Sequence, residues 1–206
     1  MERAPATRPL IGLALVWAVG LVASGWAPYD RATWALEVAP APVAFAVLWG
    51  LRRHFSLTRL ALGLIGMHGL VLMLGGAYTY ARVPVGFAVQ DWLGLARNPY
   101  DRFGHLVQGF VPAIVFREVL VRIVGVRRGA WLVGLVLACC LALSAAYELL
   151  EFAVAVAAGQ GADAFLGTQG DEWDTQWDML CCLIGAAAAL ALLSRPHDRA
   201  IAGEAP

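Results

Sequence analysis

The sequence predicts an all-α fold, a polytopic helical bundle of about six transmembrane helices with both termini in the cytoplasm. Of its 206 residues, 60% are hydrophobic and 15% are charged, and the mean hydropathy is +0.68. Several apolar runs reach about 18 to 20 residues, the length that spans a hydrocarbon core about 30 Å thick. All basic residues are arginines, and their uneven distribution between the loops indicates the orientation of the bundle.

Six apolar runs give the expected spans, at residues 10–27, 34–51, 57–80, 104–124, 129–157 and 173–194. They form a single transmembrane domain over residues 1–206, with short solvated tails at 1–9 and 196–206. The length of the first run and the lack of a small-residue cleavage site favour a retained helix over a signal peptide. With both termini inside, ten arginines lie on the cytoplasmic side and four lie outside.

The third span and the segment after it have polar features of their own. The glycines of the third span allow close approach of a neighbouring helix, and His68 lies at the midpoint of this span. For this histidine an interhelical hydrogen bond is favoured over a role as a ligand or in proton transfer. The next stretch, VPVGFAVQDWLGLARNPYDR, is too polar to cross a membrane, so residues 85–96 are expected to form an interfacial amphipathic helix.

The two adjacent cysteine pairs, each in an apolar run, are expected to be packing residues.

Three stretches carry polar residues whose placement inside a membrane is costly without a partner or a function. They are YDRFGHLVQGFVP, SAAYELLEF and GTQGDEWDTQWDM. At 100° per residue, each stretch presents one polar stripe about 60° wide. Span four begins, span five ends and span six begins on the external side, so the stripes share one depth. We expect them to form a single outward-facing pocket. The stripes are Asp101, His105 and Gln108; Glu148 and Glu151; and Asp171, Asp174 and Asp178.

Several of these residues also have structural explanations. Asp171 is placed to cap the last helix, and Asp174 suits the dipole of that helix. Asp178 lies a full turn deeper, beyond the reach of a cap. Asp101 and His105 are equally well explained as a local i,i+4 pair.

One imidazole and up to six carboxylates suit a divalent cation such as Mg²⁺, Mn²⁺ or Zn²⁺. In the enzymatic hypothesis His105 and Glu148 are catalytic, either one serving as general base. The expected metal ligands are Glu151, Asp171, Asp174 and Asp178, and Asp101 and Gln108 complete the pocket. Without a cation the carboxylates repel one another and suit a proton relay, so a transporter and a scaffold stay open as alternatives.

The polar motifs resemble the YjdF-like family of bacterial inner-membrane proteins. YDRFGH, YELLE and LGTQGDEWDTQWDM occur in the order and spacing of that family, and the likeness covers residues 98–199. The function of the family is uncharacterised. The resemblance therefore implies a multi-pass protein of the bacterial inner (cytoplasmic) membrane more than it implies an activity.

A fainter resemblance is to VanZ-like membrane proteins, which are associated with resistance to teicoplanin-type glycopeptides. An Asp, a His one turn later, a Glu on the next helix and an Asp opening the last helix recur in that family. The residues that match are Asp101, His105, Glu148 or Glu151, and Asp174. Gln108, Asp178 and several additional acids depart from the pattern, so only the layout of the pocket is compared.

The sequence thus predicts an integral inner-membrane protein whose outward-facing acidic and histidine pocket binds a divalent cation. The pocket is expected to bind or act on an envelope molecule, either lipid-linked or phosphate-bearing. The alternatives are a small proton-coupled transporter and a membrane scaffold protein. The expected partners are the lipid bilayer and such an envelope molecule or lipid-linked substrate, and no nucleic acid is expected.

Overall fold

A computed structural model describes residues 7–158 and 168–204 of the chain. The described residues contain helices and no strand, which confirms the all-α class. The helices are α1 (Thr7–Gly25), α2 (Arg31–Val38), α3 (Pro40–Leu51), α4 (Arg59–Ala77), α5 (Pro84–Leu93), α6 (Tyr100–Val119), the π-helix η1 (Leu120–Val124), α7 (Ala130–Ala158) and α9 (Asp174–Glu204).

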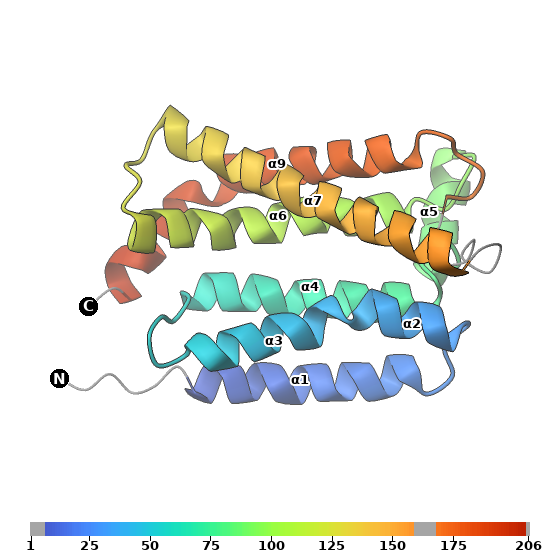
Figure 1. Ribbon diagram of the computed structural model, residues 1–206, viewed down its shortest axis with the longest axis horizontal. Helices are drawn as coiled ribbons and strands as arrows, with labels where there is room; N and C mark the ends of the chain where they lie inside the picture. The colour runs from blue at the N-terminus through green and yellow to red at the C-terminus, as the bar shows by residue number, and fades with distance from the viewer. Residues whose placement is uncertain (1–6, 159–167, 205–206) are drawn as a thin grey trace.

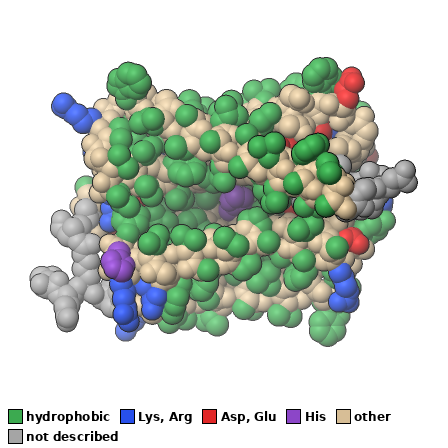
Figure 2. All heavy atoms as spheres, in the orientation of Figure 1, with side chains coloured by type: hydrophobic (Ala, Val, Ile, Leu, Met, Phe, Trp, Pro, Cys, Tyr) green, Lys and Arg blue, Asp and Glu red, His purple; other side chains and the backbone are tan. Residues whose placement is uncertain are grey.

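The long helices run along a common axis in two groups (Figure 1). One group contains α1, α2, α3 and α4, and the other contains α6, α7 and α9. The start of α1 and the end of α9 lie at the same end of the bundle, as an even number of passes requires. Apolar side chains cover the face seen in Figure 2, and charged side chains gather toward its two ends. This distribution fits a polytopic membrane protein.

Five segments are long and apolar enough to cross a membrane: Thr7–Gly25, Arg31–Leu51, Arg59–Ala77, Ala130–Ala157 and Asp174–Glu204. The sixth pass is α6, whose 20 residues extend about 30 Å at 1.5 Å per residue. This helix is more polar than the others, but it packs against α4, α7 and α9 and buries eleven of its residues. Its polar side chains therefore face protein and not lipid.

The second span, expected at residues 34–51, is found at Arg31–Leu51 and is interrupted at one residue, Ala39, which keeps helical dihedral angles. Helix α2 ends at Val38 and α3 starts at Pro40, because proline has no N–H to donate and fits the first helical position. The start of α2 is fixed by Asp30, which accepts a hydrogen bond from the Thr33 backbone N–H at 2.7 Å. This hydrogen bond lowers the pKa of the Asp30 carboxyl. In the last turn of α2, Glu37 is only 5% exposed.

Two glycines bring the backbones of α6 and α9 into direct contact. A Cβ atom at Gly109 would lie 1.8 Å from the Cys182 carbonyl oxygen, and one at Gly185 would lie 1.9 Å from the Leu106 carbonyl oxygen. Cys182 and Cys140 are fully buried in this interface, and all four cysteines are free. The cysteines therefore act as small packing residues, as expected.

The carboxy-terminal tail expected at 196–206 needs correction, since α9 continues to Glu204. The helix continues because one face of its last turns, which carries His197 and Ile201, is buried. His197 is completely buried, and its Nε2 lies 3.0 Å from Oε2 of Glu118. Asp198 accepts a hydrogen bond from Arg117 at 2.7 Å. These contacts attach the end of α9 to α6.

Candidate functional site

The starts of α6 and α9 and the last part of α7 lie at one end of the bundle (Figure 1). The structure therefore brings the three expected polar stripes to the same end. Five of their residues are buried, which is unusual for ionisable side chains and points to partners or ligands. They are Asp101 and His105 on α6, Glu148 on α7, and Asp174 and Asp178 on α9.

At the centre of this group, His105 lies between two carboxylates from different helices. Nδ1 of His105 is 3.8 Å from Oε1 of Glu148, and Nε2 is 3.9 Å from Oδ2 of Asp178. One ligand atom from each of the three side chains lies within 4.8 Å of the others. Oε1 of Glu148 and Oδ1 of Asp178 are buried and accept no hydrogen bond from any described residue. These three residues are called the cation triad below.

Next to the triad, Arg97 neutralises three of the expected site residues. It forms ion pairs with Asp174, with Asp101 at 3.3 Å and with Asp171 at 3.7 Å. Asp101, Asp174 and Asp178 are close enough to hold a metal ion as well. Because Arg97 already supplies positive charge to two of the three, this second group has less need of a cation than the triad has.

The expected metal ligand Asp171 is also engaged by an arginine. It precedes α9, where its Oδ1 accepts a hydrogen bond from the Trp173 backbone N–H at 2.9 Å, and it pairs with Arg102. The guanidinium of Arg102 lies 5.2 Å from the ring centroid of Trp177. Asp171 is therefore not the N-cap residue of α9, although it does order the turn that leads into the helix. Sequence analysis counted these arginines only as loop charges.

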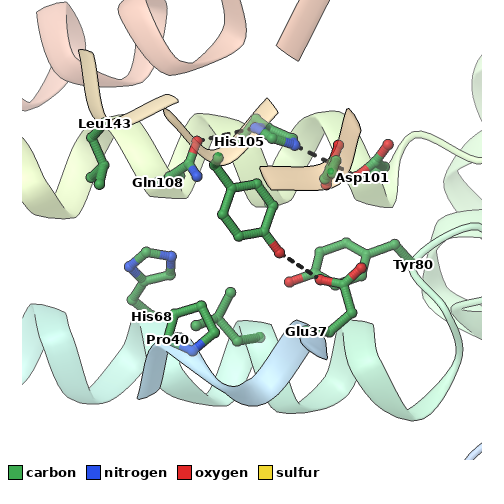
Figure 3. A pocket seen from close by; sticks show the side chains of 12 residues that line it. Glu37, Pro40, His68, Tyr80, Asp101, His105, Gln108 and Leu143 are labelled. Carbon is green, nitrogen blue, oxygen red and sulfur yellow. Dashed lines mark hydrogen bonds and ion pairs between the residues drawn. The ribbon is translucent and has the colours of Figure 1, made fainter. Parts of the chain in front are cut away.

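A cavity of about 120 Å³ adjoins the triad and lies between the two groups of helices (Figure 3). Two of the five buried stripe residues, His105 and Asp101, also line this cavity. Helices α2 and α4 also contribute to its wall, although the pocket was expected to involve the last three spans alone. The polar residues of the wall are Glu37, His68, Tyr80, Asp101, His105, Gln108, Tyr147 and Glu151.

Glu37 is a site residue that sequence analysis missed. The Tyr147 hydroxyl donates to its Oε2 at 3.0 Å. An acid within an apolar span was the available signal. Glu151, expected as a metal ligand, lines the cavity with Glu37 and is not a member of the triad.

Nε2 of His68 is buried and has no partner among the described residues, so it does not make the expected interhelical hydrogen bond.

A family model described as "Predicted membrane protein (DUF2238)" matches residues 9–199. The "Inner membrane protein YjdF" of Escherichia coli (strain K12) is 51% identical over 186 residues, which are 90% of this chain and 89% of the relative. No solved structure matches. The matches confirm the YjdF-like resemblance and the expected class, a multi-pass protein of the bacterial inner membrane. They give no support to the likeness to VanZ-like proteins.

Proposed function

The chain belongs to the membrane-protein family DUF2238, and on that premise we propose that it binds a divalent cation on His105, Glu148 and Asp178. The cation in turn holds an envelope molecule for binding or hydrolysis in the outward-facing pocket. The observation that carries the proposal is the convergence of three buried ligand atoms from α6, α7 and α9.

The distances within the triad suit a cation better than direct hydrogen bonds. Separations of 3.8 Å and 3.9 Å are too long for hydrogen bonds. A cation with ligand bonds of about 2.0 to 2.2 Å holds its ligands about 3 to 3.5 Å apart. One ligand atom from each triad residue lies within 4.8 Å of the others, so small side-chain movements toward a bound ion bring the three ligand atoms to that separation.

The ligand types narrow the choice of metal. An imidazole with two carboxylates favours Zn²⁺ or Mn²⁺ over Mg²⁺, which prefers oxygen ligands and retained waters. Three protein ligands leave a coordination position open for a water or a substrate atom. An ion held by these three residues would supply the chemistry of metal-assisted hydrolysis.

Gln108 and Asp101 support the triad from outside it. Nδ1 of His105 lies 3.1 Å from Oε1 of Gln108, so an N–H on Nδ1 donates to the amide and leaves Nε2 available as the ligand. Oδ1 of Asp101 lies 3.8 Å from Nε2 and adds negative charge beside the ion. Because His105 and Glu148 are ligands in this arrangement, neither serves as the general base of the original hypothesis.

Elemental analysis of the full chain, purified in detergent without chelators and then supplied with Zn²⁺ or Mn²⁺, tests the proposal. We expect about one ion per chain in the wild type and a large loss in Asp178→Asn and Glu148→Gln. Glu172→Gln is the matched control, because Glu172 is an exposed acid near the same end. A folded wild-type protein that takes up neither metal would refute the cation site and favour a proton relay.

A further inference from the structure

We propose that the cavity beside the cation triad receives a primary ammonium group, so that the molecule bound by this protein is an amine. The inference rests on the proposed function and names its ligand class, since the cavity and the triad share His105. A cavity of about 120 Å³ has room for a small polar group such as an ammonium.

The charges on the cavity wall favour a cation over a phosphate. Among the residues that the structure describes, three acids line the cavity and no arginine does. Asp101 is paired with Arg97, but within the described residues neither Glu37 nor Glu151 forms an ion pair. An unpaired carboxylate in a membrane interior is costly, so a positive group between these acids offsets that cost. An anion in the same place would add repulsion.

The hydrogen-bonding groups of the wall match an ammonium group in particular. Figure 3 shows Glu37 and His68 on the same side of the cavity, facing the side that carries Asp101 and His105. The buried Nε2 of His68 has no partner among the described residues, and it accepts a hydrogen bond in the neutral tautomer that carries its proton on Nδ1. A primary ammonium has three N–H donors for such acceptors, whereas a quaternary ammonium has none.

Aromatic rings add to this preference. Tyr80 and Tyr147 both line the cavity, and rings attract a cation placed over their faces. The Tyr147 hydroxyl also fixes the orientation of Glu37 through a hydrogen bond of 3.0 Å. The site is thus held in place before a ligand arrives.

The surface around the cavity suggests how an amine enters. Figure 2 shows a histidine side chain in a hollow of the apolar face, midway between the charged ends. His54 lies in the turn after α3 at one end of the bundle, and His197 is completely buried. The other two histidines, His68 and His105, both line the cavity, so the cavity is open on this apolar face. An amine can enter as the headgroup of a lipid or as a free molecule.

Calorimetric titration of the full chain with ethanolamine, choline and inorganic phosphate tests the inference. We expect ethanolamine to bind, choline to bind about tenfold more weakly or worse, and phosphate not to bind. Equal binding of choline, preference for phosphate, or no binding of ethanolamine by the folded protein would each overturn the inference. Competition by phosphatidylethanolamine in nanodiscs, with phosphatidylcholine as reference, identifies a headgroup ligand, and its absence identifies a free amine.

Variants separate this inference from the cation site. Glu37→Gln is expected to weaken ethanolamine binding about tenfold while the metal content stays unchanged. Glu151→Gln tests the same point without disturbing a hydrogen bond, because the Glu151 carboxyl has none with a described residue. The control Glu172→Gln, an exposed acid outside the site, is expected to change neither the metal content nor ethanolamine binding. Unchanged ethanolamine binding in both the folded Glu37→Gln and Glu151→Gln variants would contradict the assignment of this cavity.

Discussion

Replacing Glu118 by glutamine should destabilise the protein strongly, although this residue lies at the end of the bundle opposite the candidate site. Glu118 is completely buried, and its two oxygens accept hydrogen bonds from four donors. The Thr58 backbone N–H and hydroxyl each donate at 2.8 Å, His197 contributes Nε2 at 3.0 Å, and Arg122 completes the set. One carboxylate therefore joins α4, α6, η1 and α9.

The expected magnitude follows from these partners. An amide in place of the carboxylate removes the negative charge and turns an acceptor into a donor that faces other donors. Breaking a buried ion pair by removing one partner costs about 3 to 5 kcal/mol. Arg122 keeps a hydrogen bond of 2.8 Å to the Ser56 carbonyl and stacks on Phe55, so it is not left without partners. We therefore expect a loss of about 3 kcal/mol, at the lower end of that range.

The free energy of unfolding can be measured in mixed detergent and SDS micelles for the wild type, Glu118→Gln and the control Glu172→Gln. The exposed control should change the free energy by about 0.5 kcal/mol or less. A loss below about 1 kcal/mol in Glu118→Gln would refute the reasoning, because it would mean that the network adds no more than an ordinary hydrogen bond.

Two further predictions concern packing and topology. Gly185→Ala places a Cβ against a backbone oxygen of α6, so it should lower the free energy of unfolding by about 1 to 3 kcal/mol or more in the same assay. In the control Gly134→Ala the added Cβ meets no atom, so this variant should be tolerated. Equal stability of the two variants would contradict the close contact of α6 and α9. A cysteine introduced at Trp92 should react with a membrane-impermeant thiol reagent in intact cells, and one introduced at His54 should react only after permeabilisation. The reverse labelling pattern would invert the orientation and place the candidate site in the cytoplasm.

The helical fold was predictable because length and hydropathy decide membrane insertion before any tertiary contact forms. The meeting of the three polar stripes also followed from the sequence, since helix period and span order together set their faces and depth. His105, Glu148 and Asp178 were named as site residues on that basis. A sequence alone does not divide them into proposed ligands and proposed bases, because that division depends on distances between side chains of different helices.

Other features depend on tertiary contacts that a sequence does not display. Arg97 and Arg102 were interpreted as loop charges, although they neutralise the aspartates expected to bind metal. The polar segment after the last apolar run was interpreted as a solvated tail, whereas burial of His197 against Glu118 continues α9. Glu37 was overlooked because a single acid has no stripe of its own, and only the contact with α7 reveals its role.

A crystal structure of the Zn²⁺-loaded protein, with anomalous data collected at the zinc edge, tests the central claim most directly. We expect one anomalous peak among α6, α7 and α9, about 2.0 to 2.2 Å from His105 Nε2 and from carboxylate oxygens of Glu148 and Asp178. The claim would be contradicted by a zinc-loaded structure with no peak there, or by a peak on surface residues with the triad unchanged.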